Sequence, residues 1–243
     1  MNKLITLLFT ALILASCAKE TGNLTINGTV KGLRKGKIYL QKVKDSTLIS
    51  IDSVKIDGEP NFQFTTDIES PEVLTLYLDK NDRNNLNDQL DIFAEPGVIN
   101  VQTTRDFFAP EAKIEGSESH TKWNEYKKIR SKFGGENLDL IKEILEASKA
   151  GNIALVDSLQ TRSDQNAKRS YLYTINFVLN NTDSYVAPYI TLVDAYNVNI
   201  KYLDSISNTL TPEVADSKYG KLLREYITDI KDDIAKAEID SIN

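Results

Sequence analysis

Cysteine, histidine, methionine and tryptophan each occur only once in the 243 residues. A single cysteine excludes an intramolecular disulfide and any two-cysteine redox motif within this sequence. One cysteine and one histidine are also too few for the usual zinc or haem sites of a single chain. We therefore expect no metal site and no bound redox cofactor. We also assign no catalytic residues from the sequence.

Positive charge is scarce as well, because 29 Lys and Arg face 35 Asp and Glu, which gives a net charge of −6. Non-specific binding to nucleic acid needs a basic face, so this balance argues against nucleic acid as a partner. Hydrophobic residues make up 41% and charged residues 26%, as in ordinary globular chains. The length allows one large domain or two small ones.

The N-terminus resembles a bacterial lipoprotein signal. Lys3 is followed by an apolar run over residues 4–14 that is interrupted only by two threonines. A bilayer-spanning helix needs about 20 residues, so this run is too short to span and suits the apolar region of a signal peptide. The run ends in a tetrapeptide that matches the lipobox, formed by Leu14, Ala15, Ser16 and Cys17.

The lipobox resemblance implies a signal peptide at residues 1–16 and a diacylglycerol thioether on Cys17, with an acyl chain on its freed amino group. Two or three chains would anchor the protein firmly, since each buried CH₂ contributes about 0.8 kcal/mol. Residues 17–23 would then be the lipidated residue and a short polar tether. No aspartate follows Cys17, which favours the outer membrane of the cell envelope and leaves the leaflet open. The alternatives are an uncleaved apolar tail or a buried free thiol.

Residues 24–116 show the period-two alternation of strands with one buried face. Gly, Pro and Asp turns separate the runs, for example at residues 57–60. We predict seven to nine short strands in an antiparallel β-sandwich, because a sheet buried on both faces would lack the alternating polar residues. The expected strands contain residues 24–30, 38–40, 49–51, 54–56, 62–64, 73–78, 90–93, 99–101 and 114.

Residues 117–243 change to the spacing of three or four that is typical of amphipathic helices. This predicts an all-helical domain of five to seven helices after the sandwich, and hence an α+β protein with two domains. We expect Gly134–Gly135 to break the first helix and Asn180–Asn181 to end a long one. Ser184 is expected to cap the next helix, and Thr211–Pro212 to begin a segment that continues into the last one.

The apolar stripes of these helices are predicted to face a core rather than a partner. The prediction includes the stripe after the glycine pair, the start of the long helix and the last segment. Among its members are Leu138, Ile141, Ile144, Leu145, Leu155, Leu172, Leu222 and Ile234.

Several short motifs resemble the domain of unknown function that precedes thioredoxin-fold domains in Bacteroidota thiol-disulfide interchange lipoproteins of the AhpC/TSA group. In the sandwich half they are residues 26–30, 36–40, 51–54, 62–64, 92–97 and 114–117, and in the helical half residues 177–181, 183–187 and 217–220. The resemblance implies the fold and the cell-envelope address. It implies no redox chemistry here, since this sequence holds no Cys-x-x-Cys and therefore no thioredoxin domain is expected within it.

The remaining candidate sites have ordinary structural explanations. The segment Asp79–Asp91 could hold a cation, but its spacing is not that of an EF-hand, and a solvated hairpin loop explains it better. His120 has no motif-placed partner for catalysis, so we expect a surface or capping role. Aromatic residues could line a glycan or peptide surface, although half-buried packing is the more usual role for Tyr171, Tyr173, Tyr185, Tyr189 and Tyr196.

These observations predict a membrane-anchored cell-envelope lipoprotein with a non-catalytic binding or scaffolding role. The membrane, through the lipid, and an unidentified protein are the expected partners. Two alternatives remain open at this point. One is an accessory subunit that acts in trans with a periplasmic thioredoxin-fold oxidoreductase, and the other is a surface glycan-binding lipoprotein.

Overall fold

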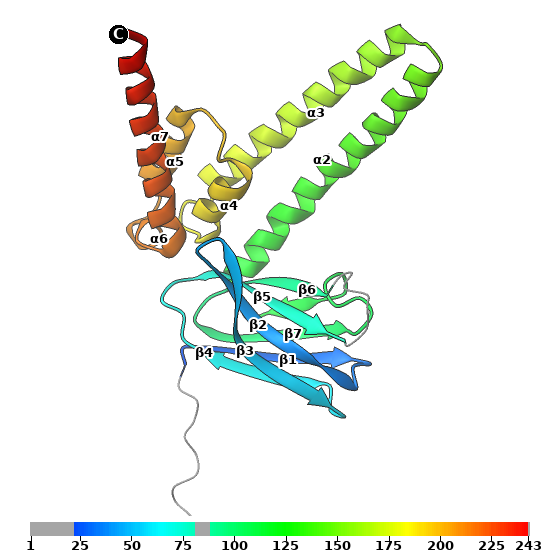
Figure 1. Ribbon diagram of the computed structural model, residues 1–243, viewed down its shortest axis with the longest axis vertical. Helices are drawn as coiled ribbons and strands as arrows, with labels where there is room; N and C mark the ends of the chain where they lie inside the picture. Colours follow the sequence, from blue (N-terminus) through cyan, green and yellow to red (C-terminus); the bar gives the residue numbers. More distant parts are fainter. Residues whose placement is uncertain (1–21, 81–87, 243) are drawn as a thin grey trace, which may run out of the picture. The chain divides into compact units, whose positions relative to one another are not determined.

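The computed structural model describes residues 22–80 and 88–242 (Figure 1). These residues fall into two compact units. The sandwich unit comprises residues 22–69 and 73–117, and the helical unit comprises residues 70–72 and 118–242. Within the described chain, eight strands precede six helices, which confirms the predicted α+β fold class.

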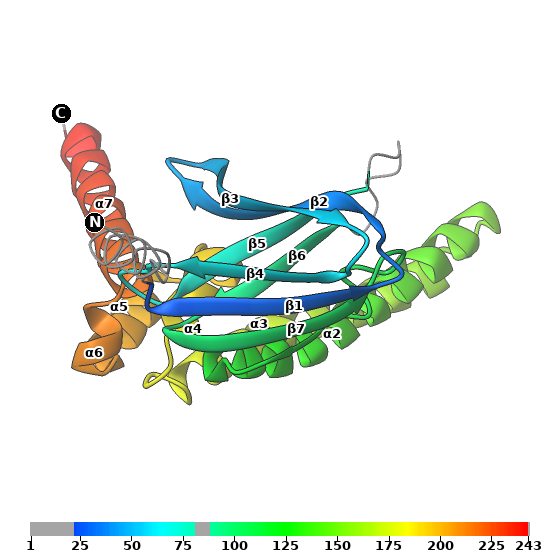
Figure 2. The ribbon, with the colours of Figure 1, turned by 90° about the horizontal axis from the view of Figure 1, so that it is seen from below.

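The strands form two four-stranded sheets in the orders β4-β1-β7-β8 and β3-β2-β5-β6. Figure 2 shows β1 between β4 and β7. Eight strands lie within the predicted seven to nine. Their bounds are β1 (Leu24–Lys31), β2 (Lys35–Lys44), β3 (Thr47–Asp57), β4 (Asn61–Thr66), β5 (Glu72–Asp79), β6 (Gln89–Ala94), β7 (Gly97–Thr104) and β8 (Lys113–Glu115).

One hydrophobic core lies between the two sheets. Ile26 and Ile99 enter it from the first sheet, and Ile38, Leu76 and Ile92 enter it from the second. All five side chains are fully buried. Because side chains alternate between the two faces of a strand, every second residue of these strands is left on the outer face of its sheet.

The pairing of β1 with β7 is parallel, whereas β1–β4, β2–β3, β2–β5 and β7–β8 are antiparallel. The sandwich is therefore antiparallel in most of its pairs but not in all. Hydrophobic alternation reports that one face of a strand is buried and carries no information on strand direction. For that reason the sequence did not indicate this parallel pair.

The hairpin of β2 and β3 contains an irregularity that explains a change of phase in the sequence. Leu40 pairs with Asp52 and Gln41 pairs with Ser50, so Ile51 is an extra residue on β3. A bulge of this kind shifts the alternation by one position. Ile51 and Val54 can consequently both pack against the core although they are three residues apart.

The helical unit contains α2 (Glu118–Lys149), α3 (Ile153–Leu179), α4 (Val186–Asp194), α5 (Ile200–Thr209), α6 (Pro212–Ala215) and α7 (Lys218–Ile242). The two longest helices, α2 and α3, lie side by side as an antiparallel hairpin (Figure 1). Their connection includes Gly151 at φ +69°, and the Asn152 side chain caps α3 by accepting a hydrogen bond from the Leu155 amide at 3.1 Å.

The predicted break at Gly134–Gly135 is wrong, because α2 continues through both glycines. A glycine in a helix interior costs only about 1 kcal/mol relative to alanine. Packing on either side compensates for that cost, since Phe133 lies against Tyr173 at 5.9 Å between ring centroids and Leu140 is buried against α3.

Other helix boundaries follow the sequence more closely. Asn180 is the C-cap of α3, as predicted. Ser184 lies one residue before the N-cap of α4, and its hydroxyl accepts from the Val186 amide at 3.4 Å. Thr211 and Pro212 begin α6, but that helix ends at Ala215 and α7 starts separately at Lys218.

The prediction that all helical stripes face a core is also wrong in part. Leu140, Ala147 and Leu159 form a small core between α2 and α3, with Ile144 and Val156 packed against it. Several other residues of the predicted stripes are exposed, and Leu138 is 69% exposed. They are Leu138, Ile141, Leu145, Leu155, Leu172, Leu222 and Ile234.

Candidate functional site

The outer face of the sheet β3-β2-β5-β6 brings aromatic and basic side chains together. Tyr39 of β2 pairs directly with Tyr77 of β5, and Lys37 pairs with Lys55 of β3. Paired residues share one face of a sheet, and Lys35 joins them by the alternation along β2. We call the group Lys35, Lys37, Tyr39, Lys55 and Tyr77 the tyrosine–lysine face.

The two tyrosines of this face are stacked, with ring centroids 5.9 Å apart and an angle of 28° between the ring planes. The Lys37 ammonium lies 4.6 Å from the centroid of the Tyr39 ring, which is a cation–π contact. Both rings are only half-buried. Charge and ring surface are thus adjacent and open to solvent.

A hollow of about 440 Å³ lies beside these residues. Lys35, Lys37, Tyr39 and Lys55 line it together with Gly36, Ile56, Asp57 and Asp79. Three ammonium groups and two carboxylates therefore surround the hollow. Such a lining can hold a small polar ligand that bears negative charge, because the ammonium groups outnumber the carboxylates by one.

Acidic residues next to this face raise the pKa of Tyr77, and one of them forms a buried ion pair. Burial raises the pKa of the Tyr77 hydroxyl, and the negative charges of Asp79 and Asp88 raise it further. The Lys80 ammonium pairs with the Asp88 carboxylate at 2.7 Å, and the two side chains are only 4% and 2% exposed. This ion pair joins the two described ends of the Asp79–Asp91 segment, whose residues 81–87 lie outside the described residues.

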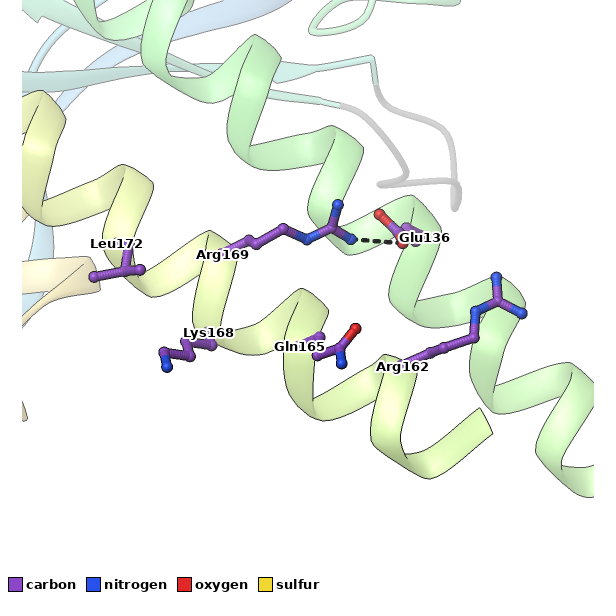
Figure 3. Close-up of a pocket in the computed structure, with 6 residues that line it drawn as sticks. All are labelled: Glu136, Arg162, Gln165, Lys168, Arg169 and Leu172. Carbon is purple, nitrogen blue, oxygen red and sulfur yellow. Dashed lines mark hydrogen bonds and ion pairs between the residues drawn. The ribbon is translucent and has the colours of Figure 1, made fainter. Parts of the chain in front are cut away.

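A second hollow, of about 430 Å³, lies on one flank of the α2–α3 hairpin (Figure 3). Arg169 of α3 pairs with Glu136 of α2 at 2.8 Å, and Arg162 pairs with Glu143 at 3.7 Å. Gln165, Lys168 and Leu172 complete the lining from α3. All four charged partners are well exposed, so each pair contributes at most about 1 kcal/mol and the flank remains open to solvent.

His120 is buried, so the predicted surface role is wrong, whereas the predicted capping role stays a prediction. It lies in the first turn of α2, is 3% exposed and meets the Trp123 ring edge-to-face at 6.0 Å between centroids. Burial, and to a lesser extent the positive charge of Lys127, lowers the pKa of His120 to about 4. A neutral imidazole in this environment is part of the packing of the helical unit.

Tyr126 is the other buried titratable group of the helical unit. Its hydroxyl donates to the Asp194 carboxylate at 2.9 Å and lies 3.0 Å from the Thr174 hydroxyl. Burial is the largest cause of a strongly raised pKa, so the phenol stays protonated. These hydrogen bonds tie α2 to α3 and α4.

The predicted tyrosine set does not form one platform. Tyr171 and Tyr196 are exposed, whereas Tyr173, Tyr185 and Tyr189 are half-buried, in line with packing. Tyr173 stacks on Tyr126 at 5.7 Å, and Tyr189 meets Tyr219 at 4.9 Å. Tyr39 and Tyr77 were not singled out from the sequence, although each occupies a position between buried residues where a strand faces outward.

The predicted lipid site, Leu14, Ala15, Ser16 and Cys17, lies outside the described residues. No described helix has the length and apolar character needed to cross a membrane. Within residues 22–80 and 88–242, no three His, Cys, Asp or Glu side chains come together as metal ligands could.

The fold and these surfaces define a two-unit α+β protein with a sandwich and a helical hairpin. Residues 24–123 match the family model of a domain of unknown function, DUF4369. The match contains all sandwich motifs on which the resemblance rests, and it extends six residues into α2. Searches of the curated proteins and of the solved structures found no match.

Proposed function

We propose that the protein is a cell-envelope lipoprotein, anchored through Cys17, with a non-catalytic binding or scaffolding role. The lipobox at Leu14–Cys17 is the observation that carries this proposal. The predicted tether of residues 17–23 is shorter than expected, because Asn23 is hydrogen-bonded to Asp67 and Ile68 of the sandwich unit. At most residues 17–21, which lie outside the described residues, would then serve as a tether. A tether of five residues spans at most about 18 Å, so the sandwich unit would stay close to the membrane surface.

The environments of the buried titratable groups support a role without catalysis. His120 packs against Trp123, and the Tyr126 hydroxyl is hydrogen-bonded to Asp194. Both groups favour their neutral forms at neutral pH, and their contacts link helices of one unit. Their perturbed pKa values are thus explained by packing, which is a common origin of such shifts.

The α2–α3 hairpin is the surface that we propose for a protein partner. Leu138, Ile141 and Leu145 are exposed at a spacing of three and four, so they share one stripe on α2. This stripe is distinct from the buried one that contains Leu140 and Ala147. Contiguous exposed apolar side chains are typical of interaction surfaces.

Substitution of Cys17 tests the anchor. A Cys17→Ala variant, compared with the wild type in its native host, should move from the membrane fraction to the soluble fraction. Mass spectrometry of the wild-type N-terminal peptide should show a lipid on Cys17. A variant that remains in the membrane fraction, or an unmodified Cys17, would refute the lipoprotein proposal.

A photo-cross-linker tests the hairpin surface in intact cells. Placed at Leu145, it should capture a discrete protein, and capture should fall when Leu138 and Ile141 are replaced by serine. The matched control carries the cross-linker at exposed Lys113 of β8, with the same serine substitutions. Capture that is unchanged by the substitutions would exclude the apolar stripe as the docking surface.

An accessory role beside a thioredoxin-fold oxidoreductase is the second candidate. The match of residues 24–123 to the uncharacterised domain favours it, because the resembling lipoproteins carry such a domain before their redox domain. In this role the protein captured by the hairpin cross-linker should contain a Cys-x-x-Cys. A captured protein without that motif would argue for the general scaffolding role instead.

A further inference from the structure

We infer that the tyrosine–lysine face of the sandwich unit binds an acidic saccharide. The two tyrosine rings would contact the apolar face of a sugar ring, and the lysines would pair with its carboxylate. The inference deepens the proposed binding role and rests on it, since it names a ligand class for a protein that we propose to be a binding protein.

The strand register fixes the positions of the groups involved. Tyr39 and Tyr77 form one cross-strand pair, and Lys37 lies opposite Lys55 in the adjacent row. Directly opposed residues of an antiparallel pair have Cβ atoms about 4.5–5.5 Å apart. Rings and ammonium groups are therefore held a short distance apart by the backbone itself, before any ligand arrives.

The ring pair accounts for the saccharide part of the inference. Each tyrosine combines a large apolar ring with a polar hydroxyl, and both rings are half-buried on a solvated sheet face. A sugar ring matches that combination, since it has an apolar C–H face and a rim of hydroxyl groups. The adjacent hollow of about 440 Å³ is of the size that small-molecule sites usually have.

The charge distribution accounts for the acidic part. Residues 31–55 contain seven Lys or Arg and two Asp, a net +5 within a chain of net −6. Among these lysines, Lys55 pairs loosely with Asp57 at 3.7 Å, and both side chains of that pair are well exposed. Asp57 stands opposite Lys35 and Asp79 opposite Lys37 in the strand register. The three ammonium groups around the hollow therefore exceed the two carboxylates by one, and a carboxylate on a ligand would meet that excess positive charge.

The backbones of β2 and β5 approach each other closely at Gly36. A Cβ on Gly36 would lie 2.8 Å from the carbonyl oxygen of Asp79, a distance that no side chain could occupy. Gly36 thereby lets β2 lie against the end of β5 where the hollow is formed. The site is built on paired strands, which position side chains more precisely than loops do.

Calorimetric titration of the full-length, lipid-modified protein in detergent tests the inference. Tetragalacturonate is the acidic probe, and maltotetraose is the neutral probe of equal length. We expect binding of the acidic probe alone, weakened about tenfold by Tyr39→Ala and by Lys37→Gln, and weakened further by added salt.

Matched controls exclude general effects of charge and ring removal. Lys113→Gln on β8 and Tyr171→Ala on α3 should bind the acidic probe as the wild type does. If Tyr39→Ala does not fold, Lys55→Gln serves as the second test, because Lys55 is exposed. It should weaken binding of the acidic probe. Absence of tetragalacturonate binding, equal binding of maltotetraose, or equal losses in the Lys113 and Lys37 variants would each overturn the inference. None of these results would alter the Cys17→Ala fractionation, so the two proposals fail separately.

Discussion

At the scale of single residues, the burial of His120 makes the stability of the helical unit depend on pH. Its pKa is about 4 in the folded protein and about 6.5 in an unfolded chain. Between these pH values the unfolded state binds more protons, so the free energy of unfolding decreases as the pH falls from about 6.5 to about 4. The pKa difference corresponds to about 3 kcal/mol.

Urea unfolding of wild type and His120→Gln at about pH 7.5 and about pH 4.5 measures this contribution. Carboxylate titrations are common to both proteins and cancel in the comparison. We expect the wild type to lose about 2–3 kcal/mol more than the variant over this interval. Equal losses would mean that His120 is as accessible to protons in the folded state as in the unfolded chain.

The ion pair between Lys80 and Asp88 predicts a large effect from one substitution. Both side chains are almost completely buried, so Lys80→Ala would leave an uncompensated buried carboxylate. Loss of one member of a buried pair costs about 3–5 kcal/mol. The pair Lys55–Asp57 is the exposed counterpart, and Lys55→Ala should cost less than about 1 kcal/mol.

Denaturant midpoints of the two lysine variants give that comparison directly. The double variant Lys80→Ala/Asp88→Ala should be more stable than Lys80→Ala alone, because it removes the orphaned charge. Similar midpoints for Lys80→Ala and Lys55→Ala would show that the pair near β5 is solvated in solution.

At the scale of elements, two glycines should respond to alanine in opposite directions. A Cβ on Gly28 of β1 would lie 2.0 Å from the ring of Phe62, its partner on β4, so Gly28→Ala should destabilise by about 1–3 kcal/mol. A Cβ on Gly134 of α2 has no neighbour within 4 Å, so Gly134→Ala should stabilise by about 0.5–1 kcal/mol. Thermal unfolding gives both signs, and a destabilising Gly134→Ala would indicate that the helix needs flexibility there.

The strands and α2 also show which features of an element sequence periodicity can predict and which it cannot. Alternation located the strands, because a strand with one buried face must repeat every two residues. The Gly134–Gly135 break was mispredicted, since local propensity of about 1 kcal/mol per glycine is smaller than the packing energy of the flanking residues. The exposure of Leu138 and Leu145 was missed for a related reason: periodicity identifies an apolar stripe but not what covers it.

The tyrosine–lysine face could be predicted only in part. Tyr39 and Tyr77 stand at outward positions of alternating strands, and that much is visible in the sequence. Their proximity depends on the pairing of β2 with β5, which lie far apart along the chain. Strand order is a long-range property that composition and spacing do not encode.

At the scale of the whole molecule, the charge distribution bears on how the protein would attach to a membrane. Residues 17–243 carry 28 basic and 35 acidic side chains, a net −7, because only Lys3 is lost with residues 1–16. With +5 in residues 31–55, the rest of that chain carries −12. An anionic bilayer repels such a surface overall and would attract only the basic segment.

Salt separates these two modes of attachment. Electrostatic attraction is screened over about 3 Å at 1 M ionic strength, whereas the burial of acyl chains is not weakened by salt. Washing native membranes with about 1 M NaCl should therefore leave the protein bound, and a mild detergent should release it. Release by salt alone would mean that the basic segment, rather than the lipid on Cys17, holds the protein on the membrane. Because the basic segment includes three lysines of the tyrosine–lysine face, salt-resistant attachment would also leave that face available for a ligand.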